Sequence, residues 1–419
     1  MPSVTFTTSG VLQKSALRRA NDRLVLDTIR RNPGVSRTQL AQITGFSPTS
    51  MNFVVNRLLK RSLVREKKRK HEAGSGRPPS GIWLRSDALT AIGVEIARPV
   101  STVILANLEG GIVATHSVPW HENPEHLLES LAVTIRAVGA LPEARQVLGV
   151  GVSVAGTVER QTGRVIGAEN IGWFGVEAGA ILRRLVEWPV LFENDANLSA
   201  VAEQWYRPRN GPALRYFVYL QMEGGLGSAV VVDGRILHGS SSSGTEFGHI
   251  TLYPEGHLCS CGNRGCWEQY ASDMALVREY RQRAGIDEGA EDIFEESHRV
   301  VALAREGDPH ALAALHSTAR HLGLGLASMI AALNPQAIII GEPIASAWDL
   351  VVDIIQSVLV DRVPSYHRNG LQLMPSRTDT HSALRGAAIL ALKSYFDHFD
   401  QATPEASPNR VNMEAHELA

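Results

Sequence analysis

Residues 249–268 read HITLYPEGHLCSCGNRGCWE, and this stretch holds all three cysteines of the 419-residue chain. Thiolates this close together, with a histidine upstream, suit one tetrahedral Zn²⁺ held by three sulfurs and one imidazole. A disulfide framework would instead need an even number of cysteines and a secreted protein. We therefore predict a structural Zn²⁺ with no coordination position left open for catalysis, bound by His249, Cys259, Cys261 and Cys266.

The same region resembles the zinc signature of the ROK family, which joins sugar-responsive bacterial repressors and sugar kinases. The resemblance rests on the motif E-x-G-H at 246–249, followed by C-x-C-G-x-x-G-C-x-E at 259–268. Further matches extend it from about residue 20 to 395. Two or three domains fit a chain of this length.

The overall composition is that of an ordinary globular protein, with 44% hydrophobic and 20% charged residues. No apolar run is long enough for a membrane span, so no membrane association is expected. Residues 1–10 lack the basic start and apolar core of a signal peptide. Together with three unpaired thiols, these features predict a cytoplasmic protein.

The charge is unevenly distributed along the chain. Residues 1–80 hold 16 Lys and Arg against 4 Asp and Glu, a net charge of +12, whereas the rest of the chain carries −14. A basic head on an acidic body favours a polyanionic partner for the head alone. A solvated basic surface is the alternative, and the motifs within the head argue against it.

The head begins with patterns that predict two helices. The first is expected after Asn21-Asp22 and ends at Pro33-Gly34. The second opens with a capping box at Ser36–Gln39 and stops at Gly45. The positions expected to be buried are Leu24, Val25, Thr28, Ile29, Leu40, Ala41 and Ile43.

A third helix is predicted to open at Ser47-Pro48 and to bury Met51, Val54, Val55, Leu58 and Leu59. Two helices joined by a tight turn make a helix-turn-helix, whose second helix lies in the major groove of double-stranded operator DNA. Packing against a neighbouring domain is the alternative for an exposed Phe53. The exposed face predicted to contact DNA is Thr49, Ser50, Asn52, Phe53, Asn56 and Arg57.

Two wing strands are predicted at 63–64 and 82–84, with a basic, glycine-rich loop between them. Such a loop suits phosphate or minor-groove contact, although a flexible linker is the alternative. The predicted contacts are Lys67, Lys68, Lys70 and Arg77. The head as a whole resembles the N-terminal domain of ROK repressors. Because symmetric repressors read paired half-sites, we expect a homodimer or homotetramer.

The body alternates short apolar runs with helical periods, which predicts an α/β fold. Strands are expected at 91–96, 102–108, 111–118, 147–154, 190–192, 216–222, 228–232, 235–237 and 337–340, and helices at 125–138 and from about 197. The family resemblance implies two lobes of an actin-like, ribonuclease-H-like fold. The expected domains are a winged helix-turn-helix with its linker (1–87), a first ROK lobe (88–199 and 382–398), a second lobe with the zinc site (200–381), and a disordered tail (399–419).

Polar residues 193–197 directly follow a predicted buried strand, where α/β folds usually bind ligands. In ROK sugar kinases the matching aspartate is the general base on the sugar hydroxyl, and here it is Asp195. The resemblance implies that His249 serves zinc and sugar together. Turn and cap roles are the alternative, above all for Asn170. The implied sugar-binding set is Gly156, Asn170, Asn194, Asp195, Glu246, His249 and Glu268.

The three loops that face ATP in ROK kinases are altered in this chain. The first has Glu95 for the family's Asp, and Ala97-Arg98-Pro99 for its glycines and threonine; proline also removes an amide donor. The second, residues 223–227, lacks the family's threonine, and the third reads Gly341-Glu342-Pro343. We therefore expect no catalytic residue, with Asp195 kept only as a hydrogen-bond acceptor.

These patterns predict a transcriptional repressor that senses a sugar without phosphorylating it. A sugar kinase with a fused DNA-binding head is the alternative from another class, and the altered phosphate loops argue against it. A zinc sensor is disfavoured, because a closed site binds metal too tightly to report ordinary fluctuations. A phosphosugar or a protein partner in place of the sugar stays open.

Overall fold

A computed structural model of the chain describes residues 14–68, 80–207, 214–240, 244–287, 292–377 and 381–397. They divide into two compact units, which are described separately. The head contains the described residues up to Trp83, together with those from Lys393 onward, and the body runs from Leu84 to Leu392. No helix in the described part of the chain is long and apolar enough to cross a membrane.

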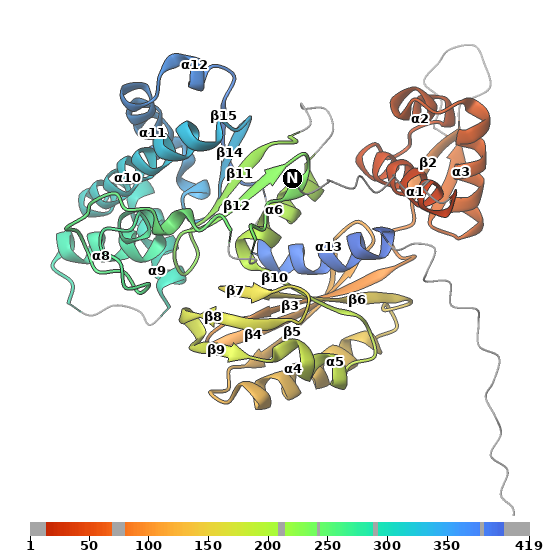
Figure 1. Cartoon of the computed structure of the whole chain (residues 1–419), viewed down its shortest axis with the longest axis horizontal. Helices are drawn as coiled ribbons and strands as arrows, with labels where there is room; N and C mark the ends of the chain where they lie inside the picture. Colours follow the sequence, from red (N-terminus) through yellow and green to blue (C-terminus); the bar gives the residue numbers. More distant parts are fainter. Residues whose placement is uncertain are drawn as a thin grey trace, which may run out of the picture. The chain divides into compact units, whose positions relative to one another are not determined.

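The head has three helices followed by a two-stranded sheet, as the sequence predicts (Figure 1). Its elements are α1 (Lys14–Arg31), α2 (Arg37–Thr44), α3 (Pro48–Lys60), β1 (Val64–Lys68) and β2 (Ser80–Leu84). The capping box is confirmed: the Ser36 hydroxyl accepts from the Gln39 amide, and the Gln39 side chain accepts from the Ser36 amide. Gly45 ends α2 in the left-handed region at φ 75°.

Three details of the predicted head are wrong. Helix α1 begins at Lys14, well before Asn21-Asp22. Leu24 is 41% exposed, because it lies more than a third of a turn from the centre of the buried face that runs through Asp22, Val25 and Ile29. Ile43 is 40% exposed near the end of α2. The other positions expected to be buried are so, except Leu59, which is half-buried.

The first sheet of the body has the strand order β10-β6-β3-β4-β5. β3, β4 and β5 form an antiparallel meander; β6 pairs in parallel with β3, and β10 pairs in parallel with β6. The strands are β3 (Thr90–Ile96), β4 (Val100–Asn107), β5 (Ile112–Pro119), β6 (Val147–Val154) and β10 (Val190–Asn194). A small sheet missed by the sequence analysis follows β6: β7 (Thr157–Glu159), β8 (Arg164–Ala168) and β9 (Trp173–Val176), with the 3-10 turn η1 (Glu169–Ile171).

The second sheet repeats this order as β13-β12-β11-β14-β15. Its first three strands are again an antiparallel meander, and its last two are again parallel additions. The strands are β11 (Phe217–Gln221), β12 (Gly227–Val232), β13 (Arg235–Ile236), β14 (Ala337–Ile340) and β15 (Gln372–Pro375). This duplicated topology confirms the two-lobed α/β fold that the family resemblance implies.

Helices cover both faces of the first sheet (Figure 1). Leu127 and Leu131 of α4 (Pro124–Gly139) pack with the strands on one face, together with α5 (Ala178–Leu185). On the other face, Leu384 and Ala388 of α13 (Ser382–Asp397) pack on Ile104 of β4. Gly151 of β6 permits this approach, because a Cβ there would lie 1.9 Å from a backbone oxygen of α13.

The second sheet carries the larger helical layer, with α10 buried at its centre. Its elements are η2 (Phe247–His249), α7 (Glu268–Ala271), α8 (Asp273–Ala284), α9 (Ile293–Arg305), α10 (Pro309–Leu333), η3 (Ala345–Ala347), α11 (Trp348–Arg362) and α12 (Ser365–Arg368). Helix α6 (Asp195–Tyr206) packs on β11 and β12 and on β10 and β6, so it links the two lobes. Asn194 and Asp195 lie at its N-terminus.

Candidate functional site

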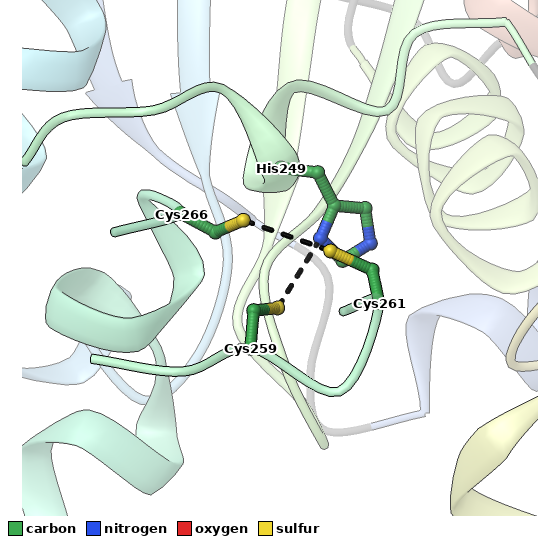
Figure 2. Close-up of side chains that lie close together, drawn as sticks. All are labelled: His249, Cys259, Cys261 and Cys266. Atoms are coloured by element: carbon green, nitrogen blue, oxygen red, sulfur yellow. Dashed lines mark hydrogen bonds between the residues drawn. The ribbon is translucent and has the colours of Figure 1, made fainter. Parts of the chain in front are cut away.

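The predicted metal ligands converge on one point. The ligand atoms of His249, Cys259, Cys261 and Cys266 all lie within 4.8 Å of one another, as Figure 2 shows. The Cys261 and Cys266 sulfurs are 3.7 Å apart, and the Cys259 sulfur is 3.6 Å from Nδ1 of His249. A tetrahedral zinc site with ordinary bond lengths has S–S and S–N edges of about 3.8 and 3.5 Å. The four residues therefore could hold one metal ion of this kind.

The loop that carries the cysteines is shaped by its own backbone. The Cys259 amide donates to the Asn263 carbonyl over 2.8 Å, which folds residues 259–263 into a tight turn. Gly265 adopts φ +73°, and a Cβ there would lie 1.6 Å from the Tyr253 carbonyl oxygen. Glycine is therefore required directly before Cys266.

The turn that carries His249 is equally constrained. Gly248 of η2 lies against the loop after β11, where a Cβ would be 2.2 Å from the Leu226 carbonyl oxygen. Glu268 starts α7 and joins the two segments: its carboxylate accepts from the Leu226 amide over 3.1 Å and lies 3.7 Å from the Cys259 sulfur. The metal ligands and the predicted sugar ligands are thus parts of one packed structure.

Asp195 lies at the first position of α6, directly after β10. Its carboxylate accepts from the amide groups of Asn194 and Gln221, both over 2.9 Å. Burial raises the pKa of Asp195 to about 7, and the negative charge of Glu246 acts in the same direction. Asn194 also caps α6 and donates to the Gly156 carbonyl over 3.1 Å. Hydrogen-bond acceptors therefore gather at this helix terminus.

The remaining predicted sugar ligands lie around the same point. Burial raises the pKa of Glu246, and the negative charges of Glu169 and Glu268 act in the same direction. Asn170 of η1 reaches across from the first lobe and donates to the Gly224 carbonyl over 2.9 Å. The structure brings the predicted set together, and its role in sugar binding stays a prediction.

In the first of the three loops that correspond to ATP-facing loops of ROK kinases, polar groups form hydrogen bonds and ion pairs within the chain. After β3, the Ala97 amide donates to the Ser101 hydroxyl over 3.3 Å. The Arg98 guanidinium stacks on Trp120 at 4.6 Å and pairs with Glu122 at 2.9 Å. The first loop therefore presents neither a free Ala97 amide nor an amide at proline.

Amides of the second loop donate to carboxylates, and the third loop contains a carboxylate that accepts from an amide of η3. The Gly224 amide donates to Asp273 over 2.8 Å, and the Leu226 amide donates to Glu268. In the third loop, Glu342 accepts from the Ser346 amide over 3.0 Å. Carboxylates of the chain itself thus accept hydrogen bonds from backbone amides in or beside these loops.

A cleft of about 850 Å³ opens beside Asp195, between the first lobe and the second. Several of its walls were not predictable from the sequence, because they meet only in the folded chain. One sequence feature could have identified two of these residues. Glu95 and Glu223 lie near the ends of β3 and β11, which are equivalent strands in the two sheets. The side chains that were missed are Ser153, Gln221, Glu223, Asp273, Asp292 and Glu295.

In the head, most of the predicted recognition face is exposed. Phe53 is 70% exposed, and Thr49, Ser50, Asn52 and Asn56 are also accessible. The guanidinium of Arg37 donates to the side-chain oxygens of both Asn52 and Asn56, at 3.1 and 3.0 Å, and to Glu66 at 3.0 Å.

Arg57 departs from the prediction of an exposed face. It is half-buried, and its guanidinium forms a bidentate pair with the buried carboxylate of Asp22 on α1. This pair ties α1 to α3. In the wing, Lys67 is exposed on β1 and Lys68 ends that strand, whereas Lys70 and Arg77 lie outside the described residues.

Comparison with known proteins places this geometry in a family. A family model described as the ROK family matches residues 91–394, and one described as winged helix-turn-helix DNA-binding matches residues 18–65. The xylose repressor of Bacillus spizizenii is 26% identical over 392 residues, which cover 92% of this chain and 98% of that protein. The glucokinase of Streptomyces coelicolor is 35% identical over 276 residues, which cover 63% of this chain and 85% of the glucokinase.

A solved ROK-family transcriptional regulator, a homologue of the Escherichia coli MLC protein, has the same fold. It superposes with a TM-score of 0.74 at 24% identity, covering 91% of this chain and 97% of that one. The likeness to repressors spans nearly the whole chain, whereas the likeness to kinases is partial. The chain belongs to the ROK family, as a DNA-binding transcriptional regulator with an N-terminal winged helix-turn-helix.

Proposed function

We propose that the protein represses genes of carbohydrate uptake or catabolism and responds to a sugar bound beside Asp195. One contrast carries the proposal. Hydrogen-bond acceptors that suit sugar hydroxyls gather at the start of α6, while the loops that would hold ATP phosphates are closed by internal bonds. A polyol needs such a ring of acceptors, because each buried polar group must be paired.

Zinc is the metal we infer for the site formed by His249 and the three cysteines. Three thiolates and one imidazole fill a tetrahedral shell, so the ion would supply structural order rather than reactivity. Its contribution here would be to hold η2 and the cysteine loop together, and thereby to fix the side chains of Glu246 and Glu268 near Asp195.

The head would bind operator DNA as part of a homodimer or homotetramer. The exposed amides of Asn52 and Asn56 suit adenine edges, and Phe53 suits a thymine methyl group. Lys67, with Lys68, Lys70 and Arg77, would contact the DNA backbone or the minor groove. Sugar binding in the body would then alter the spacing of two heads.

A sugar kinase with a fused DNA-binding head is the second candidate. The partial likeness to a glucokinase and the pKa of Asp195, raised by burial to about 7, favour it. A carboxyl group with such a pKa suits general base catalysis near neutral pH. The internal bonds of the phosphate loops argue against it.

The proposal is tested by operator titration in the presence and absence of sugar. An operator is first selected from random DNA with the purified chain. Xylose and glucose are then added to the wild type, to Asp195→Asn and to a control, Glu129→Gln, which removes an exposed charge on α4. We expect Asp195→Asn to abolish the sugar effect and to leave sugar-free affinity unchanged, with the control behaving as wild type. Operator binding that no sugar alters would contradict the proposal.

A further inference from the structure

The cleft beside Asp195 is strongly acidic. Among its described lining residues the one cation is Arg98, whose guanidinium is already committed to Glu122 and to the Ile171 carbonyl. The described lining of the cleft therefore holds several carboxyl groups and no uncommitted cation. The carboxylates that line the cleft are Glu95, Asp195, Glu223, Asp273, Asp292 and Glu295.

Two of these carboxylates lack a counter-charge. Within the described part of the chain, the side-chain carboxylates of Glu95 and Glu223 make no hydrogen bond and no ion pair. Burial raises the pKa of Glu95 to about 7, with a further contribution from the charge of Asp195. Burial also raises the pKa of Glu223, with the neighbouring carboxylates acting in the same direction. Acidic groups held together in this way are stabilised by a cation.

An independent feature points into the same space. Ser153 lies on β6 in register with Glu95 on β3, and it lines the cleft. It is only 1% exposed, and its hydroxyl has no hydrogen-bond partner among the described residues. A buried hydroxyl without a partner is costly, so its presence at the wall of a cleft indicates a missing ligand atom.

The cleft carboxylates do not converge on one point as the ligands of the candidate zinc site do. Among the described residues, His249 and the three cysteines alone bring three or more potential metal ligands within 4.8 Å of one another. The cleft carboxylates form no such group. An organic ammonium group, which donates up to three hydrogen bonds in different directions, suits acceptors that do not meet at one point.

From these observations we propose that the cleft binds the protonated amine of an amino sugar whose hydroxyl groups are held at Asp195. The inference deepens the proposed function and rests on it, because the sugar ring is placed by the same acceptors. Ser153, Glu95 and Glu223 would accept hydrogen bonds from the ammonium group. The same charges would reject a sugar phosphate, because its dianion would lie among carboxylates in a medium that screens poorly.

The experiment is calorimetric titration of the full chain at neutral pH with four probes. These are glucose, 2-amino-2-deoxyglucose, 6-amino-6-deoxyglucose and glucose 6-phosphate. We expect at least one amino sugar to bind about tenfold or more tightly than glucose, which corresponds to about 1.4 kcal/mol. Glucose 6-phosphate is expected to bind more weakly than glucose. Equal affinity for neutral and cationic sugars, or tighter binding of the phosphate, would overturn the proposal.

Variants connect the preference to the cleft. Glu95→Gln and Glu223→Gln should each remove most of the preference for the amine while leaving glucose affinity within about twofold. Ser153→Ala should lower the affinity for the amino sugar without lowering thermal stability. The Ser153 hydroxyl has no hydrogen-bond partner among the described residues, so its removal breaks no bond there. The control Glu129→Gln should change neither the affinity for the amino sugar nor the affinity for glucose. A preference that survives both glutamate variants would place the amine elsewhere and refute the proposal.

The outcomes separate this inference from the proposed function. If glucose alters operator binding but no amino sugar is preferred, the inference fails and the sugar-responsive repressor stands. If amino sugars bind with the expected preference but no sugar alters operator binding, the regulatory function fails and the cleft assignment stands.

Discussion

Cys261 is the metal-ligand candidate whose loss can be read most cleanly, because its side chain is exposed while Cys259 and Cys266 are buried. Cys261→Ala leaves no cavity, so its effects would report the metal. We expect the bound zinc to fall from one ion per chain to a small fraction, measured by elemental analysis, and the sugar response to disappear. Ser260→Ala, one position away, is the matched control and should keep its zinc. Full zinc in a folded Cys261→Ala protein would refute the assignment.

Arg57 and Asn52 share one helix but should respond differently to truncation. Arg57→Ala leaves the buried Asp22 carboxylate without its partner and should lower the free energy of unfolding of the head by about 2 kcal/mol. Asn52→Ala or Asn56→Ala should leave stability unchanged and weaken specific operator binding by about 1–3 kcal/mol. Thermal melts and operator titrations distinguish the two. An Arg57→Ala protein of wild-type stability would contradict the role given to the ion pair.

Glu95 gives a prediction on pH. Burial raises its pKa from 4.5 to about 7 in the folded chain, so the folded state binds this proton more tightly than the unfolded state does. The stabilisation is full at low pH and is lost as the pH rises from about 4.5 to about 7. Glu95→Gln, which mimics the protonated form, should therefore be nearly neutral at about pH 5 and raise the melting temperature by a few degrees at about pH 8. A difference from wild type that does not change with pH would contradict the burial of this carboxyl group.

Local spacing made the metal site predictable, since its three cysteines lie within eight residues and its histidine lies ten residues upstream of the first of them. The direction in which a side chain points was harder to predict from the sequence. The period of α3 places Arg57 near its exposed edge, and the folded head turns the guanidinium toward Asp22. The bonds from Arg37 to Asn52 and Asn56 join α2 to α3, and no local pattern signals them.

At the scale of elements, the five strands of the first sheet were predictable from the sequence, and the small sheet that follows β6 was not. β6 was expected at its observed limits, because it is an unbroken apolar run. The small sheet of β7, β8 and β9 was missed, because buried and exposed residues alternate irregularly along its short strands. The acidic cleft was also missed, because Glu223 and Asp273 reach it from separate elements of the second lobe.

The wing is the element whose role is most directly measurable. Neutralising Lys67, Lys68 and Lys70 together should lower the affinity for every DNA sequence, because lysine contacts with phosphates carry no sequence information. The slope of the logarithm of affinity against the logarithm of salt concentration should flatten by about 0.9 for each phosphate that the variant no longer neutralises. Unchanged binding to non-specific DNA would remove the wing from the interface.

At the scale of the whole molecule, a symmetric assembly should read a symmetric operator. Light scattering should give a mass of at least two chains, and footprinting should protect two half-sites about one helical turn, or a multiple of it, apart. A monomer bound to a single half-site would contradict this organisation.

The central claim is that this ROK chain senses a sugar without phosphorylating it. The most direct test measures ATP consumption and ATP binding by the purified wild type in the presence of glucose, xylose and the amino sugars. Because the Gly224 and Leu226 amides are held by Asp273 and Glu268, we expect no measurable ATP binding and no sugar-dependent release of ADP. Sugar-dependent ADP release by the wild type that disappears in Asp195→Asn would contradict the account and establish a kinase.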